Sequence, residues 1–136
     1  MKEWSKHWKA SKDPGKQRKY KYNAPLHVQK KFLDVNISKE LRKKYGMRNI
    51  QIRKEDTIKV LRGQFKKRTG KITRVDIKRS RVYVEGIEMI KKDGNKVQIP
   101  LTPSNLQITD LNLDDKRRIK KKKGAENVKQ KTPQKT

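Results

Sequence analysis

The stretch TIKVLRGQFKKRTGKITRV, residues 57–75, reads as two short strands joined by a charged loop. Residues 57–61 and 71–75 are rich in Thr, Ile and Val, which are common in strands. Between them, the loop 63–70 begins and ends with glycine and holds three consecutive cations. This pattern predicts a β-hairpin whose strands hold the charged loop in place.

The β pattern continues after this hairpin. Val82 and Val84 alternate with polar residues, which places both on one face of a strand. Further on, Asp93-Gly94-Asn95 is typical of the turn between two paired strands. We predict a mainly β fold, a small antiparallel barrel over residues 48–112. The expected strands are residues 57–61, 71–75, 81–85, 88–90, 96–99 and 106–109.

The segment 22–47 has helical rather than strand signals. Pro25 suits the beginning of a helix. Asn36 or Ser38 can cap a second helix, and Gly46 can end it in the left-handed conformation. We therefore expect a short helical segment before the barrel.

Positive charge is concentrated towards the two ends of the chain. The 136 residues include 40 Lys and Arg against 14 Asp and Glu, which gives a net charge of +26. Residues 1–47 carry 14 basic and 4 acidic groups, residues 48–115 carry 16 and 9, and residues 116–136 carry 10 and 1. We expect a compact body between an extended basic N-terminal arm, residues 1–21, and a basic C-terminal helix end and tail, residues 113–136.

This excess of positive charge disfavours a compact state unless a polyanion lies nearby. Apolar residues make up 30% of the chain, and even with its seven glycines the total is about 35%, below the ~45–50% of ordinary domains. No apolar run approaches the ~20 residues that span a bilayer. The start MKEWSKHWKAS, residues 1–11, lacks the apolar part of a signal peptide. We expect a cytoplasmic protein bound to nucleic acid, with no membrane span.

The sequence lacks the usual patterns of catalytic and metal sites. His7 and His27 lie in different segments, and the chain has no cysteine to complete a zinc site. Phosphate-binding glycine loops of the known spacings are absent. The carboxylate pairs Glu55-Asp56 and Asp114-Asp115 lie near Lys and Arg, which favours surface ion pairs. We expect no enzyme, no cofactor, no metal and no small-molecule substrate.

Two basic segments are the better candidates for contacts with RNA. The loop 63–70 can reach phosphates, although an ordinary solvated loop would have the same composition. In residues 16–27, cations alternate with tyrosines, whose rings can stack on unpaired bases. The alternative for residues 16–27 is a basic tail with incidental tyrosines. We expect Gly70 to let RNA approach the backbone or to adopt a positive φ.

Two further basic segments are less specific. A solvated turn explains residues 76–81 equally well, and the run 116–123 would attract any polyanion or serve as a localisation signal. Together the four segments and their flanks give a set of candidate RNA-binding residues, with two glycines in structural roles. The candidates are Lys16, Arg18, Lys19, Tyr20, Tyr22, Asn23, His27, Arg62, Lys66, Lys67, Arg68, Lys71, Arg79, Arg81, Lys116, Arg117 and Arg118, with Gly63 and Gly70 as the structural glycines.

Several blocks of the sequence resemble one family of ribosomal proteins. The likeness runs in order from about residue 16 to residue 118 and is to large-subunit ribosomal protein twenty-four, called twenty-six in eukaryotes. Arg68, Thr69 and Gly70 follow one another without the extra residue that is expected in eukaryotic members of the family, so the archaeal form fits better. The blocks that carry the likeness are a KOW-like stretch at 52–72, YNAPLH at 22–27, the helical stretch 37–46, VYVEG at 82–86 and TPSNLQI at 102–108.

The resemblance implies an SH3-like barrel with a KOW motif and a role as a structural constituent of the large ribosomal subunit. It also implies binding to the 5′ domain of ribosomal RNA near the polypeptide exit tunnel, neighbouring ribosomal proteins as partners, and an early role in subunit assembly. Glu55 and Arg68 stand where the family usually has glycine, so we expect less strained or differently supported turns there, with Arg68 adding a phosphate contact.

Other functions would explain part of the pattern. A KOW module of transcription elongation would need an adjoining α/β domain and a less basic surface than this chain has. A DNA-compacting protein would share the charge, and competition between duplex DNA and ribosomal RNA would distinguish it. Binding to a membrane surface is poorly supported because no long basic amphipathic helix is present.

Overall fold

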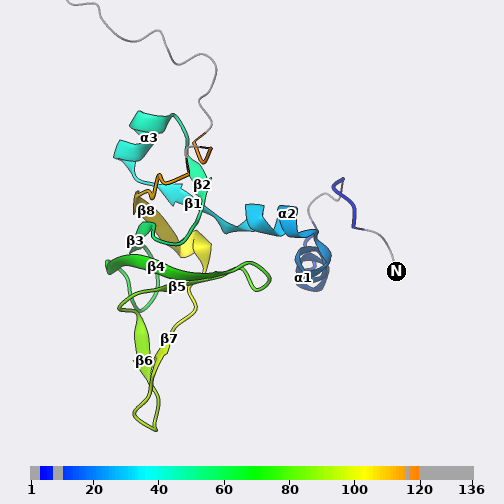
Figure 1. Cartoon of the computed structure of the whole chain (residues 1–136). Helices are drawn as coiled ribbons and strands as arrows, with labels where there is room; N and C mark the ends of the chain where they lie inside the picture. The colour runs from blue at the N-terminus through cyan, green and yellow to red at the C-terminus, as the bar shows by residue number, and fades with distance from the viewer. Residues whose placement is uncertain (1–3, 8–10, 116, 120–136) are drawn as a thin grey trace, which may run out of the picture.

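The computed structural model describes residues 4–7, 11–115 and 117–119. Most strands form one sheet in the order β2-β1-β8-β3-β4-β5, and β6 and β7 form a separate hairpin (Figure 1). The sheet curls around a single core, which confirms the predicted small, mainly β, SH3-like barrel. The strands are β1 Asp34–Ile37, β2 Asn49–Gln51, β3 Thr57–Val60, β4 Thr69–Asp76, β5 Arg81–Val84, β6 Glu88–Ile90, β7 Lys96–Gln98 and β8 Leu106–Asp110.

The core is built from the alternation of apolar residues along the strands. Ile58 and Val60 on β3, for example, are at most 1% exposed, while Lys59 between them faces solvent. Burying one such aliphatic side chain contributes about 1.5–3 kcal/mol. The same period of two gives the other strands one face inside the barrel. The core residues on strands are Val35, Ile37, Ile50, Ile58, Val60, Ile72, Val82, Val84, Leu106 and Ile108.

Strand β1 differs from the expected division of the chain. Val35 and Ile37 lie in the core, and β1 pairs antiparallel with β2 and parallel with β8. We expected residues 22–47 to be helical and the barrel to begin at 48. The need to bury these two side chains places a strand inside that segment, so the barrel includes residues from before 48 and is not wholly antiparallel.

Short helices precede the barrel, as predicted, and others interrupt it. The Ser38 hydroxyl accepts a hydrogen bond from the Leu41 N–H at 3.3 Å, and Gly46 ends the same helix with φ of 64°. Pro25 directly precedes another helix. The helices are α1 Pro14–Asn23, α2 Leu26–Gln29, α3 Lys39–Tyr45 and the 3₁₀ turns η1 Lys30–Leu33 and η2 Pro103–Asn105.

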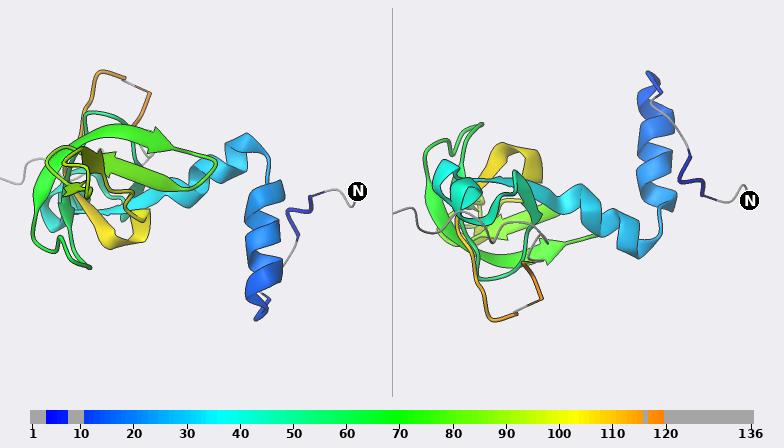
Figure 2. Two further views of the ribbon diagram at one scale, coloured as in Figure 1. Left: turned by 90° about the horizontal axis from the view of Figure 1, so that it is seen from below. Right: turned by 90° about the horizontal axis from the view of Figure 1, so that it is seen from above.

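Helix α1 begins at Pro14, within residues 1–21, where we expected an extended arm. Asp13 caps it, since one carboxylate oxygen accepts a hydrogen bond from the Gly15 N–H at 2.8 Å, and Pro14 occupies the first turn. Both features favour the start of a helix. The helix stands away from the barrel and is joined to it through α2 and η1 (Figures 1 and 2).

The predicted helix end at residues 116–123 is not seen in the part of that run that the structure describes. Residues 117–119 form a turn, in which the Arg118 N–H donates to the Asp115 carbonyl at 3.0 Å. Residue 116 and the stretch 120–136 lie outside the described residues.

Gly70 is required where β4 passes close to the end of β5. A Cβ at this position would lie 2.7 Å from the Glu85 carbonyl oxygen and 2.8 Å from Cγ1 of Val84. Its φ is not positive. The expected positive φ is therefore wrong, and close packing of the chain on itself explains the glycine.

A Gly70→Ala protein is expected to lose about 1–3 kcal/mol of unfolding free energy, because the added methyl group must displace backbone. Urea denaturation measures the change. The control is Lys71→Ala at the next, exposed position, where we expect a change within about 0.5 kcal/mol. Equal stability of the two variants would contradict the packing role of Gly70.

Candidate nucleic-acid interface

The loop between β3 and β4 is closed by backbone hydrogen bonds at its base. The Lys67 N–H donates to the Val60 carbonyl and the Val60 N–H to the Arg68 carbonyl, both at 2.8 Å. Phe65 packs against the core from inside the loop, and the Arg68 guanidinium lies 5.2 Å from the centre of its ring. The loop is thereby held firmly while Lys66, Lys67 and Arg68 remain exposed, an arrangement suited to contacts with phosphates.

Backbone conformation in the turns differs from what we expected at Glu55. Glu55 has φ of 66°, in the left-handed region that favours glycine. The turn therefore keeps the glycine conformation with a larger residue, and the expectation of a less strained turn is wrong there. In the loop, Gly63 has φ of 96° and Lys67 has φ of 73°, whereas Arg68 does not have a positive φ.

The turn between β4 and β5 presents one of its two candidate arginines more freely than the other. The Asp76 carboxylate accepts a hydrogen bond from the Arg79 N–H at 3.1 Å, which fixes the turn and leaves the Arg79 side chain exposed. Arg81 also faces solvent, but its Nη1 donates to the Thr102 hydroxyl at 2.7 Å. The Arg79 side chain is thus available to a partner, whereas the Arg81 side chain already forms a hydrogen bond within the barrel.

Helix α1 has no buried residue, so its cations face solvent on all sides. The two tyrosines of this helix differ. Tyr22 is 83% exposed, whereas the Tyr20 ring packs against Trp4 with 5.1 Å between ring centres. Tyr22 is therefore the better placed of the two for stacking on a base. The exposed candidates on α1 and α2 are Lys16, Arg18, Lys19, Tyr22, Asn23 and His27.

Arg118 is not available to RNA and has to be removed from the candidates. Its side chain is 2% exposed and pairs with Asp56, which is fully buried. Both terminal nitrogens of the guanidinium donate to the two carboxylate oxygens, and they also donate to the carbonyls of Asn112 and Gln51. Asp56 accepts two further hydrogen bonds, from the N–H groups of Arg53 and Asn112. This buried ion pair fastens the C-terminal segment to the barrel.

The remaining candidates do not form one patch. The loop 61–68 precedes β4 and the turn 77–80 follows it, so the two lie at opposite ends of an eight-residue strand, about 26 Å apart at ~3.3 Å per residue. The turn points to the side of the barrel that carries α2 and α1 (Figures 1 and 2). Lys71 and Arg62 belong with the loop end, both exposed. Arg117 is exposed near the C-terminal segment, and Lys116 lies outside the described residues.

Comparison with known proteins identifies the family. The model for the ribosomal protein L26 family, which describes the eukaryotic proteins of that name and their archaeal counterparts, matches residues 11–123. The chain belongs to this family. It is also 50% identical over 108 residues to the large ribosomal subunit protein uL24 of Methanoculleus marisnigri, covering 79% of this chain and 89% of that protein. The resemblance in the sequence is therefore confirmed.

Membership of the ribosomal protein L26 family means that the chain is a structural ribosomal protein and not an enzyme. Two structural observations concern other kinds of site. The described residues contain no group of three or more His, Cys, Asp or Glu side chains that could hold a metal ion. Over the same part of the chain, we find no helix with the length and apolar character to cross a membrane.

The acidic residues of this family member have structural roles that the sequence predicted only in part. We expected surface ion pairs at both carboxylate pairs. Arg53 and Asp115 form such a pair at 2.8 Å, with both side chains 44% exposed. Asp56 instead lies in the interior, where Arg118 neutralises it.

The hydrogen bond from the Arg53 side chain lowers the pKa of the Asp115 carboxyl below its usual value, with further help from the Arg117 N–H. A lowered folded-state pKa means that the pair stabilises the protein above about pH 4 and loses this effect as pH falls through the folded-state pKa. We expect Arg53→Met to raise the pKa of Asp115 towards its usual value. An NMR titration of the carboxyl carbon measures this, with Lys54→Met as the control for lost charge. Equal pKa values in wild type and Arg53→Met would contradict the assignment.

Sequence reasoning missed one group of surface residues: Arg74, Tyr83 and Gln98. A signal for Tyr83 was present, because alternation in residues 81–85 places Tyr83 on the face opposite Val82 and Val84. Tyr83 therefore lies on the outer face of β5, where it is partly exposed.

Proposed function

We propose that this protein is a structural constituent of the large subunit of the cytoplasmic ribosome, where it binds ribosomal RNA. The observation that carries the proposal is the placing of exposed cations at opposite ends of a small rigid barrel and on a helix that stands apart from it. Such a protein can contact several RNA segments at once and hold them together. Its partners are large-subunit RNA and the ribosomal proteins beside it.

The energetics of helix α1 support a polyanionic partner. It has ten residues, buries none of them and carries four cations and no acidic residue. A helix of this length is marginal in water without tertiary packing, and its like charges repel. Phosphates along one side would neutralise these cations and release counterions. Recognition would rest on RNA shape and 2′-hydroxyls more than on base edges.

Sedimentation of cell extract with detection of this chain tests the proposal. We expect the chain to migrate with large subunits and to remain there in high salt. Migration with RNA polymerase or with chromosomal DNA would overturn the proposal in favour of a transcription or DNA-compacting role. A free pool in high salt would show that the RNA contacts are too weak for a structural constituent.

The family resemblance supports a more specific location. We propose binding to the 5′ domain of large-subunit RNA, near the polypeptide exit tunnel, and an early role in subunit assembly. Chemical footprinting on the isolated RNA tests the location, with protections expected in the 5′ domain. Depletion of the protein tests the role: early assembly intermediates should accumulate, whereas complete subunits that lack only this chain would argue for late addition.

A further inference from the structure

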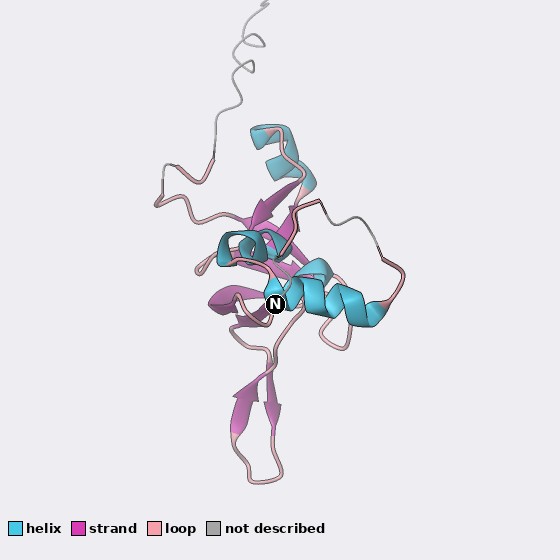
Figure 3. Ribbon diagram, turned by 90° about the vertical axis from the view of Figure 1, so that its right-hand side faces the viewer, coloured by secondary structure: helices cyan, strands magenta, loops and turns pink. Residues whose placement is uncertain are grey.

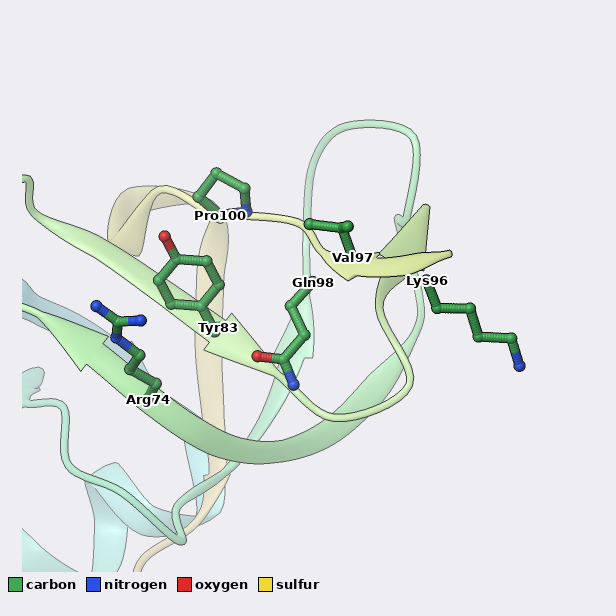
Figure 4. A pocket seen from close by; sticks show the side chains of 6 residues that line it. All are labelled: Arg74, Tyr83, Lys96, Val97, Gln98 and Pro100. Atoms are coloured by element: carbon green, nitrogen blue, oxygen red, sulfur yellow. The ribbon is translucent and has the colours of Figure 1, made fainter. Parts of the chain in front are cut away.

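An open hollow of about 550 Å³ lies between the barrel and the root of the β6–β7 hairpin. The hairpin projects from the barrel (Figures 1 and 3), and the hollow lies where β7 meets the outer face of β4 and β5. Figure 4 shows the Tyr83 ring with the Arg74 guanidinium on one side and the Gln98 amide on the other. The lining residues are Arg74, Tyr83, Lys96, Val97, Gln98 and Pro100.

The strand register brings Arg74 and Tyr83 together. They are direct partners across β4 and β5, and the guanidinium carbon lies 5.5 Å from the centre of the tyrosine ring. The register of β4 shifts between Ile72 and Arg74. A bulge of this kind turns a side chain towards a new direction and is frequent beside binding sites. Here it places a planar cation next to a partly exposed aromatic ring.

Several polar groups around the hollow have no partner in the described part of the chain. The Arg74 guanidinium makes only its contact with the Tyr83 ring, and the Tyr83 hydroxyl forms no hydrogen bond there. The Gln98 carbonyl oxygen lies 3.5 Å from the Thr73 hydroxyl, whereas the Gln98 amide nitrogen is unbonded within the same residues. Donors and acceptors are therefore available beside a flat surface.

The composition of the hollow favours a nucleobase over a protein side chain. Two of the lining residues are cations and none is a carboxylate. Aromatic rings and arginine planes are the surfaces on which unpaired RNA bases stack, and amides can bond to base edges. Lys96 extends outwards from the hairpin, away from Tyr83 (Figure 4), and adds positive charge at this edge of the hollow. The open shape suits a flat base that enters from the side.

We propose that this hollow binds one unpaired base of ribosomal RNA, stacked beside Tyr83 and Arg74 and bonded to the Gln98 amide. The proposal rests on the proposed function and adds to it a single-nucleotide site away from the β3–β4 loop. The chemistry identifies an unpaired nucleotide, which a loop or bulge of the RNA would supply.

The test compares three variants of the full chain bound to full-length archaeal large-subunit RNA made by transcription. We expect Tyr83→Leu to weaken binding by about 5- to 150-fold, the effect of losing one base stack. Its salt dependence should match wild type because no charge is removed. Tyr83→Phe keeps the ring and should bind as wild type does. Arg74→Lys keeps the charge but loses the plane, and should weaken binding about 5-fold or more.

Base-specific chemical probing supplies a second measurement. One nucleotide protected by wild type and by Tyr83→Phe should become reactive with Tyr83→Leu, while the other protections remain. Thermal denaturation checks that each variant is folded, and Gln98→Ala, at a partly exposed position, replaces Tyr83→Leu if that variant unfolds.

The outcomes separate this site from the function as a whole. Unchanged affinity and unchanged base reactivity in Tyr83→Leu and Arg74→Lys, with tight binding by wild type, would overturn the site and leave the function intact. Normal binding of these variants to isolated RNA but poor incorporation into subunits would also overturn it, since a neighbouring protein would then fill the hollow. Failure of wild type to bind the RNA would instead overturn the proposed function.

Discussion

An Arg118→Met protein is expected to unfold with a free energy about 3–5 kcal/mol below that of wild type, measured by urea denaturation at neutral pH. The substitution leaves the fully buried Asp56 without its cation, and an uncompensated buried charge is strongly destabilising. It also removes hydrogen bonds to the carbonyls of Asn112 and Gln51. Since the free energy of unfolding of a small domain is only about 5–15 kcal/mol in total, this loss would be a large fraction of the stability.

The matched control is Arg53→Met, which breaks the exposed pair with Asp115. We expect it to cost much less than Arg118→Met, because water screens an exposed pair. Arg118→Lys keeps the charge but cannot form the bidentate hydrogen bonds of the guanidinium. Its unfolding free energy should therefore lie between those of Arg118→Met and Arg53→Met. If Arg118→Met were no less stable than Arg53→Met, the C-terminal segment would be detachable from the barrel and the buried pair would have no structural importance.

Replacing Lys66, Lys67 and Arg68 together with Ala is expected to weaken binding to large-subunit RNA by about 100- to 500-fold at 0.1 M salt. This range assumes that each cation contacts one phosphate and that each contact contributes about 0.7–0.9 to the slope of log affinity against log salt. The slope should therefore fall by about 2–3 in the triple variant. A filter-binding series over several salt concentrations measures both quantities. The barrel should remain folded because all three side chains are exposed.

The control is the triple substitution of Lys39, Lys43 and Lys44 with Ala on helix α3. All three are exposed, and the net charge falls by the same amount. A much smaller loss in this variant would assign the effect to the β3–β4 loop. Equal losses would mean that overall charge, and not the position of the loop, determines binding. Unchanged binding in the loop variant would refute the role of the loop.

The sheet could be predicted largely from the sequence because its signals are local. Alternating Val and Ile residues identify β3 and β5, and Gly94 identifies the β6–β7 turn. Strand β1 could not be identified in this way. It has only four residues, lies between helical segments and depends on β2 and on β8, about 70 residues further along the chain.

The sequence predicted which types of residue form the candidate site better than it predicted where each residue lies in the structure. Lys66 and Arg118 are both cations in basic runs, yet one is exposed on a loop and the other is buried. The difference arises from Asp56, 62 positions before Arg118. Composition does not reveal such a distant partner. Likewise, the proximity of Arg74, Tyr83 and Gln98 depends on strand register and a bulge.

The parallel pairing of β1 with β8 has a consequence for how the protein folds during synthesis. Asn36 pairs with Gln107 and Ile37 with Ile108, so the barrel closes only when the chain has grown beyond residue 108. Local hairpins such as β4–β5 can form as soon as they leave the ribosome that makes them. Before closure Val35 and Ile37 have no core to enter, and pairings this distant in the chain form slowly. A chaperone or early binding to RNA would therefore act on a nascent chain in which β1 has not yet paired with β8.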